Sequence, residues 1–275
     1  QATQSFTLFA LPRAEAIAAG TNFTCALVTG GATRCWGAND KGQLGDTSTA
    51  DRPMQGDVSG LNIGTAWITA GAFHACAITA GGGGRCWGWN QNAQLGSTSA
   101  GTALYHATPL DVTGMTSNTA RLSAGAFHTC AQSSAGVAKC WGLNNTGQLG
   151  VGGAQVQNGV PVNVVEPTNV LGLSSNVTAI TTGSGHSCAI VNGGAKCWGD
   201  NGGGQIGFAR EERHLVFAGL DDVRLPPTRQ QAVTRGGFIG PQIQPQIGIV
   251  RNRQASRSGG ADRQACGVAR GLIAQ

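Results

Sequence analysis

The chain has 275 residues, a net charge of +5, 40% hydrophobic residues, 45 glycines and nine cysteines. No apolar run approaches the ~18 residues that a membrane-spanning helix needs, and the glycine content favours a turn-dense, all-β body. Residues 1–207 carry eight basic and eight acidic side chains, whereas residues 208–275 carry ten arginines and five acidic residues. A neutral first part argues against a nucleic-acid-binding face in residues 1–207.

Four copies of one module follow each other along the chain. The segment that starts at Cys25, CALVTGGATRCWG, recurs from Cys76, Cys130 and Cys188, and each copy ends in a Gly-Gln-Leu-Gly-like turn. Self-similarity of this kind indicates a repeat architecture. We expect a lead-in over 1–13, repeats over about 14–65, 66–117, 118–174 and 175–207, and an irregular, Arg-rich tail over 208–275.

Within one repeat the pattern predicts four short strands and no helix. In the first copy they are Ala16–Ala19, Phe23–Val28, Ala32–Trp36 and a strand near Met54–Val58. The second and third form a hairpin. Odd spacing requires a three-residue loop in the first three copies, with Gly31, Gly82 and Gly136 in the left-handed position. The fourth copy is one residue shorter and has Asn192-Gly193, the preferred pair for a two-residue type I′ turn.

This register places the two cysteines of each repeat opposite each other across the hairpin. At a non-hydrogen-bonded pair the Cα atoms lie about 4.5 Å apart, which a disulfide can span. The spacing predicts four disulfides, each contributing a little under ~3 kcal/mol, and they join Cys25–Cys35, Cys76–Cys86, Cys130–Cys140 and Cys188–Cys197. Reduced cysteines that act as small apolar core residues are the alternative. Zinc is disfavoured because the close spacing of structural sites is absent, and Cys266 has no counterpart.

Three further sets of residues recur or stand out. We interpret His74, His128 and His186 as bonded to the backbone of their own repeat, without a metal, because Phe23 takes that place in the first copy. Asn39, Asn90, Asn144 and Asn201 are expected to stabilise the turn after the third strand, and Trp36, Trp87, Trp141 and Trp198 to pack the repeats. Trp89, Tyr105 and His106 lie outside these positions and are candidate partner-binding residues.

The motifs Gly-x-x-His-x-Cys-Ala, Cys-Trp-Gly-x-Asn and Gly-Gln-Leu-Gly resemble the regulator of chromosome condensation repeat family, above all its cysteine-bearing bacterial version. The resemblance covers about residues 14–207. It implies a β-propeller with four-stranded blades, usually seven around an axis. Cys25 and Leu27 would face one neighbouring blade and Trp36 the other. Four repeats would make a small propeller or part of a larger one.

After Gly207 the repeat pattern stops and Arg-, Gln- and Pro-rich sequence follows. One hypothesis is a shifted reading frame near Phe208, with further blades in the native protein. The other is a disordered native tail. Because the chain begins at Gln1, we expect either that a leader has been removed or that the chain is a fragment.

No catalytic constellation and no cofactor motif emerges, so the sequence favours a non-enzymatic scaffold that binds a protein partner. The binding loops would be those that differ between copies, 46–60, 97–116 and 151–173. Paired cysteines favour an extracellular or cell-surface location, with a cytoplasmic one as the alternative. Relatives implied by the resemblance leave two other functions open: guanine-nucleotide exchange on a small GTPase, and an inhibitor or glycan-binding propeller. The partner and the oligomeric state are not specified by the sequence.

Overall fold

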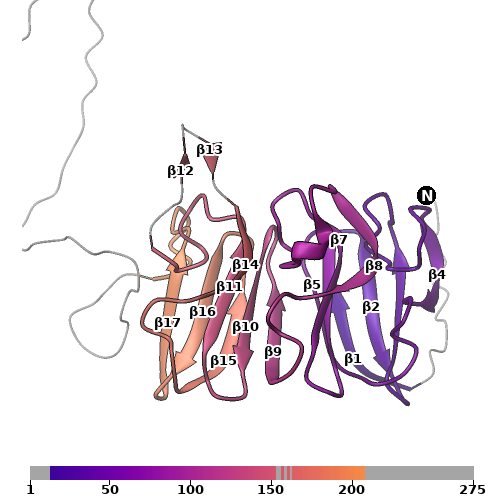
Figure 1. Ribbon diagram of the computed structural model, residues 1–275, viewed down its shortest axis with the longest axis horizontal. Coiled ribbons are helices and arrows are strands. Elements are labelled where there is room, and N and C mark those ends of the chain that lie inside the picture. The colour runs from indigo at the N-terminus through magenta and orange to yellow at the C-terminus, as the bar shows by residue number, and fades with distance from the viewer. Residues whose placement is uncertain (1–12, 153–155, 158–159, 162, 208–275) are drawn as a thin grey trace, which may run out of the picture. The chain divides into compact units, whose positions relative to one another are not determined.

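The computed structural model describes residues 13–152, 156–157, 160–161 and 163–207, all within one unit of the chain (Figure 1). The predicted tail and Cys266 lie outside these residues. Within them the only helix is a single turn, η1 (Thr98–Ala100), so no described helix is long enough to cross a membrane. The all-β prediction is confirmed.

The strands form consecutive antiparallel sheets, one for each repeat. The first sheet is β1 (Ala14–Ala19), β2 (Phe23–Val28), β3 (Ala32–Gly37) and β4 (Arg52–Asp57). The second is β5 (Thr65–Ala70), β6 (His74–Thr79), β7 (Gly84–Trp89) and β8 (Tyr105–Asp111). The third is β9 (Thr119–Ala124), β10 (His128–Ser133), β11 (Ala138–Gly142) and β14 (Val164–Asn169). A small hairpin of β12 (Val156–Gln157) and β13 (Val160–Pro161) precedes β14.

The fourth sheet has three strands within the described residues: β15 (Val177–Thr182), β16 (His186–Val191) and β17 (Gly194–Gly199). A four-stranded sheet was predicted here as in the other repeats. In the first three sheets the outer strand follows the Gly-Gln-Leu-Gly-like turn, and the equivalent place in the fourth repeat falls after Gly207, outside the described residues.

The hairpin turns are those that the sequence predicts. Val28 pairs with Ala32, which leaves a three-residue loop, and Gly31, Gly82 and Gly136 have φ values of 78°, 79° and 76°. In the fourth repeat Val191 pairs with Gly194, and Asn192 and Gly193 have φ values of 51° and 77°, as a type I′ turn requires. Loop length and turn residues therefore change together.

The same register opposes the two cysteines of every repeat. The Cα atoms of the four pairs lie 4.0 to 4.1 Å apart, and each pair is joined by a disulfide. Six of these eight cysteines are fully buried or nearly so, and they form part of the apolar layers between sheets. The disulfides close the hairpins from inside the core.

Neighbouring sheets pack face to face through these apolar layers. Leu27 of the first sheet and Ile68 of the second lie in one buried cluster, together with Trp87. Leu27 thus faces the following sheet, whereas Trp87, the counterpart of Trp36, faces the preceding one. The two-sided packing predicted for Cys25, Leu27 and the repeated tryptophan is confirmed by this cluster.

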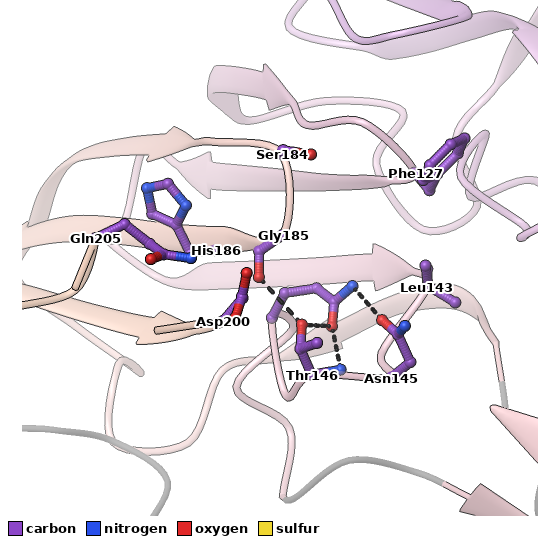
Figure 2. Close-up of a pocket in the computed structure, with 10 residues that line it drawn as sticks. Phe127, Leu143, Asn145, Thr146, Ser184, Gly185, His186, Asp200 and Gln205 are labelled. Carbon is purple, nitrogen blue, oxygen red and sulfur yellow. Dashed lines mark hydrogen bonds between the residues drawn. The ribbon is translucent and has the colours of Figure 1, made fainter. Parts of the chain in front are cut away.

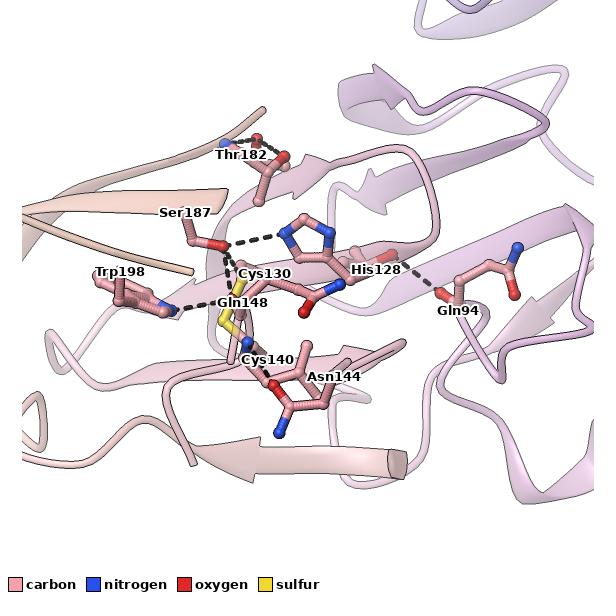
Figure 3. The surroundings of a disulfide bond; sticks show 12 residues. Gln94, His128, Cys130, Cys140, Asn144, Gln148, Thr182, Ser187 and Trp198 are labelled. Atoms are coloured by element: carbon pink, nitrogen blue, oxygen red, sulfur yellow. Dashed lines mark hydrogen bonds between the residues drawn. A yellow bond between two sulfur atoms is a disulfide. The ribbon is translucent and has the colours of Figure 1, made fainter. Parts of the chain in front are cut away.

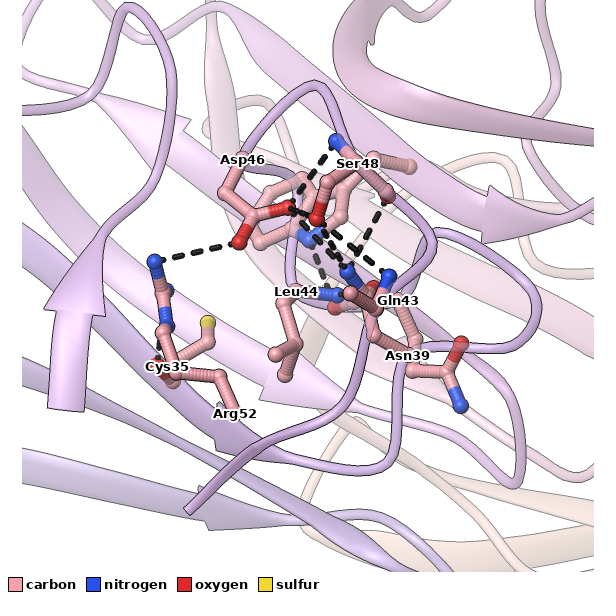
Figure 4. Close-up of polar contacts among 9 residues, drawn as sticks. Cys35, Asn39, Gln43, Leu44, Asp46, Ser48 and Arg52 are labelled. Carbon is pink, nitrogen blue, oxygen red and sulfur yellow. Dashed lines mark hydrogen bonds and ion pairs between the residues drawn. The ribbon is translucent and has the colours of Figure 1, made fainter. Parts of the chain in front are cut away.

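The repeated asparagines stabilise the turn after the third strand, as predicted. Asn39 Oδ1 accepts the backbone N–H of Leu44, and its amide donates to Asp46 and Ser48 (Figure 4). The equivalent bonds run from Leu95 to Asn90, from Leu149 to Asn144 and from Ile206 to Asn201.

Asp46 extends the asparagine turn of the first repeat to the outer strand, because its carboxylate also binds Arg52 at 3.1 Å. Burial acts to raise the pKa of Asp46, but hydrogen bonds from Ser48 and Asn39 and the charge of Arg52 outweigh it and hold that pKa below the usual value. The turn therefore depends on an ionised carboxylate.

The histidines connect neighbouring repeats, so the prediction that each binds the backbone of its own repeat is wrong for two of them. His74 Nε2 lies 2.9 Å from Thr129 Oγ1, and His128 Nε2 lies 2.9 Å from Ser187 Oγ (Figure 3). Each ring stands at the start of its strand and reaches out of the sheet toward the next one. A hydrogen bond between two neighbouring sheets cannot be predicted from the sequence of one repeat alone.

Each hydroxyl in turn belongs to a small hydrogen-bond relay. Ser187 Oγ donates to the main-chain oxygen of Gln148 at 2.9 Å, and Trp198 Nε1 donates to the same oxygen at 2.9 Å (Figure 3). Thr129 and Trp141 bind Gln94 in the same way. Because the hydroxyl proton is committed to the glutamine carbonyl, the histidine donates from Nε2.

Candidate functional site

The most distinctive surface of the described residues is a row of large apolar side chains at one edge of the sheets. This edge holds the residue before the second strand of each repeat and the residue after the Trp-Gly pair, joined by a backbone hydrogen bond such as that from Trp89 N to Phe73 O. The four pairs in chain order are Asn22 with Ala38, Phe73 with Trp89, Phe127 with Leu143, and Gly185 with Asp200. We call Phe73, Trp89, Phe127 and Leu143 the apolar row.

The members of the apolar row contact one another across two repeats. Phe73 lies against Trp89 with ring centroids 5.6 Å apart and stacks on Phe127 at 6.3 Å. All four side chains are half-buried, so each keeps a solvent-facing part. Lys41 Nζ stands 4.7 Å from the centre of the Trp89 ring, a cation–π contact. The row is thus a preformed aromatic surface with a cation at one side.

The three predicted partner-binding residues are only partly brought together. Trp89 and Tyr105 are cross-strand neighbours in β7 and β8, and Tyr105 is 44% exposed, so Tyr105 extends the apolar row outward. His106 instead bonds Ala100 O through Nε2 at 3.0 Å and supports the loop that contains η1. Sequence reasoning missed Phe73, Phe127, Leu143 and Lys41, although the place before the repeated histidine already showed phenylalanine in two copies.

A cavity of about 410 Å³ adjoins the row between the third and fourth repeats (Figure 2). Phe127 and Leu143 form its apolar side, and Asn145, Thr146, Ser184 and Asp200 are among its polar lining. Thr146 Oγ1 bonds Gly185 O at 3.1 Å and Gln148 Oε1 at 2.7 Å, which fixes the polar wall. The cavity therefore has an apolar side and a wall of hydrogen-bonding groups.

No grouping of three or more histidine, cysteine or acidic side chains suited to a metal ion occurs among the described residues. Two of the repeated histidines are buried between sheets. Burial, with a smaller contribution from the charge of His128, lowers the pKa of His74 to about 3, and burial, with a smaller contribution from the charge of His186, lowers the pKa of His128 to about 4. Neutral, fully enclosed rings of this kind are structural.

Comparison with known proteins decides the family. Models of the regulator of chromosome condensation (RCC1) repeat match residues 35–78 and 140–190, and a second model of the same repeat matches residues 15–43. The chain carries repeats of the RCC1 family over residues 15–78 and 140–190. The RCC1 repeats account for the shared glycine, cysteine-tryptophan and Gly-Gln-Leu-Gly positions on which each sheet and its turns depend.

Several RCC1-repeat proteins are similar to this chain. The ultraviolet-B receptor UVR8 of Arabidopsis thaliana is 27% identical over 73% of this chain and 44% of its own length. Protein pim1 of Schizosaccharomyces pombe is 28% identical over 84% of this chain and 44% of its own. The probable E3 ubiquitin-protein ligase HERC6 of Homo sapiens is 28% identical over 71% and 19%. The chain spans less than half the length of these curated relatives.

Solved structures show the same fold. Human WBSCR16 superposes with a TM-score of 0.61 at 22% identity, over 77% of this chain and 53% of that one. Yeast RCC1 (Prp20), solved bound to Kap60, superposes with a TM-score of 0.60 at 22% identity, over 71% and 45%. At this level of identity the likeness establishes the RCC1-type propeller fold of the described sheets.

Proposed function

We propose that this chain is a non-enzymatic propeller scaffold that binds another protein through the apolar row and the loops beside it. The observation that carries the proposal is the set of ring contacts that Phe73 makes with Trp89 and Phe127, half-buried across two repeats and flanked by Lys41. Rigid aromatic side chains that already contact each other lose little conformational freedom on binding, and such side chains dominate the energy of protein interfaces.

The polar surroundings of the row suit a protein partner. Within the described residues Trp89 Nε1 is buried without a hydrogen-bond partner, so a small rearrangement on binding would give it one. Tyr105 and the cavity beside Phe127 widen the surface on either side. An apolar anchor of the partner would enter the cavity, and its polar groups would meet Asn145 and Thr146.

The four disulfides support an oxidising location, so we propose that the scaffold is exported or displayed at a cell surface. Disulfides persist outside the cytosol and are rare inside it. The interaction partner is accordingly expected among extracellular or surface proteins.

The test is affinity capture with the full chain as bait, followed by titration of each captured protein against variants. Phe127→Ala and Trp89→Ala should each weaken the true partner about thirtyfold, the equivalent of ~2 kcal/mol. Ile63→Ala is the matched control, because Ile63 is 74% exposed beside the hairpin turns at the other edge of the sheets. It should leave binding unchanged.

Two results would overturn the proposal. A partner that binds all three variants equally well would place the interface elsewhere. Release of labelled guanine nucleotide from a small GTPase on mixing would replace the scaffold function with exchange activity.

A further inference from the structure

The apolar row is interrupted between the third and fourth repeats. Phe73 stacks on Phe127 across the second and third repeats, with ring centroids 6.3 Å apart. The equivalent place in the fourth repeat is Gly185, which has no ring to continue the stack. A backbone hydrogen bond from Ala126 N to Ser184 O, the residues just before these two places, joins the loops of the two repeats. The cavity of about 410 Å³ therefore lies where a further aromatic ring would stand beside Phe127 (Figure 2).

The space at Gly185 is left by a missing side chain and not by an unusual backbone. Gly185 does not have a positive φ. A Cβ atom added to it would meet Asp200 Cβ at 3.5 Å and Thr146 Oγ1 at 3.8 Å, both ordinary contacts. Because Asp200 and Thr146 both line the cavity, a side chain at this place would begin inside it.

The other member of the fourth-repeat pair brings a charge to the cavity. Asp200 stands where the second and third repeats have Trp89 and Leu143. Its Oδ1 accepts the backbone N–H of Gly202 at 2.9 Å, and it forms no ion pair with any described residue. The cavity lining holds this one aspartate and no glutamate, lysine or arginine. An unpaired carboxylate thus shares the cavity with the apolar side that Phe127 and Leu143 form.

This combination fits a cation on an alkyl stem. Lysine and arginine side chains pack their stems on apolar surface and keep the charged end in a polar environment. An aromatic ring such as that of Phe127 attracts the cation, and a carboxylate accepts charge-assisted hydrogen bonds from it. A purely apolar side chain would cover the carboxylate of Asp200 without supplying a counter-charge, which is costly. Charge complementarity therefore favours a cationic side chain over an apolar one.

We propose that the cavity takes the side chain of a lysine or arginine of the protein partner, and that Asp200 selects its positive charge. This inference rests on the proposed function, because it names the residue type that the partner inserts beside the apolar row. The alkyl stem is the apolar part of the anchor and packs on Phe127 and Leu143. The ammonium or guanidinium group at its end donates to the Asp200 carboxylate.

Small probes test the cavity without knowledge of the partner. The full chain, labelled with ¹⁵N, is titrated with the Nα-acetyl amides of lysine, arginine and norleucine, the last of which keeps an alkyl stem without the charge. The two cationic amides should shift the backbone signals of Thr146, Gly185 and Asp200, and norleucine should bind at least about tenfold more weakly. Equal binding of norleucine, or no shift with any of the three, would overturn the proposal.

Two variants separate charge from space. Asp200→Asn keeps the shape of the side chain and should abolish the preference for the cationic amides over norleucine. Gly185→Phe fills the cavity with the ring that continues the stack and should abolish binding of all three amides. Glu15→Gln is the control, because Glu15 is an exposed carboxylate on β1 in the first repeat, and it should bind like the unmodified chain. A preference that survives in Asp200→Asn would show that this carboxylate does not select the charge.

The same variants distinguish this inference from the scaffold function itself. A captured partner should bind Asp200→Asn and Gly185→Phe at least about tenfold more weakly than the unmodified chain. If Phe127→Ala weakens the partner and these two variants do not, the scaffold function stands and the cationic anchor is wrong. If the cationic amides bind the cavity and no captured protein responds to Phe127→Ala, the cation site stands and the scaffold function is wrong.

Discussion

The residue pair that joins neighbouring repeats varies in a coupled way along the chain. Where the first residue is histidine, its partner in the next repeat is a hydroxyl residue, as in His74 with Thr129 and His128 with Ser187. Where it is Phe23, the partner is Ala75, and both lie in one apolar cluster. The junction thus accepts either a hydrogen-bonded pair or an apolar pair, and a mixed pair should be unfavourable.

A double-mutant cycle tests this coupling. Thr129→Ala should destabilise the protein by about 2 kcal/mol, because it leaves a buried histidine N–H without an acceptor. Adding His74→Phe should recover most of the loss, since the pair then matches that of the first junction.

The measurement is urea unfolding followed by tryptophan fluorescence, at low protein concentration. Thr24→Ala is the control and should cost much less, because Thr24 makes no side-chain hydrogen bond within the described chain. A double variant no more stable than Thr129→Ala would refute the coupling.

At the scale of elements, the hairpins were predictable because everything that defines them is local. Loop parity, the left-handed glycines and the shortened Asn192-Gly193 turn fix the register of each cysteine pair within about a dozen residues. The relay and the apolar row depend instead on residues about 55 positions apart. The alternation of His with Phe and of Thr with Ala was visible in the sequence, but its meaning required knowledge of which faces meet.

The hairpin disulfides give the element-scale prediction. Mass spectrometry of the alkylated protein, before and after reduction, should show the eight repeat cysteines protected until reduction. Reduction should lower the free energy of unfolding by several kcal/mol in total, at most ~3 kcal/mol for each short loop. The Cys188→Ser/Cys197→Ser variant, in the fourth sheet, should lose one such contribution and keep the other three disulfides. Eight reactive thiols in the protein as purified from its natural compartment would contradict both the disulfides and the proposed export.

At the scale of the whole molecule, the sheets form a series in which the side chains of each repeat pack on the next repeat and form hydrogen bonds with it. The inner junctions enclose their side chains completely, since His74 and His128 are both 0% exposed. No single repeat predicts this enclosure, because it depends on which faces of neighbouring sheets meet. The stability of the whole series should then respond to groups enclosed at its inner junctions, above all the two buried histidines.

The pH dependence of unfolding measures that response. The folded-state pKa values of His74, about 3, and His128, about 4, lie below the ordinary value of 6.5 because burial disfavours the charged ring. The unfolded chain therefore binds protons first as the pH falls, so stability should be full above pH ~6.5 and should decrease toward pH ~4, by about 1.4 kcal/mol per pH unit for each histidine. Asp46 does not contribute in this window, because its carboxylate loses stabilising charge only below its unfolded value of 3.8.

Urea midpoints at pH 7.5, 5.5 and 4.5 should fall in that order, and His74→Phe/Thr129→Ala should show about half the slope. A midpoint that is constant across this range, or that rises as the pH falls, would mean that the two rings are not enclosed in the neutral form.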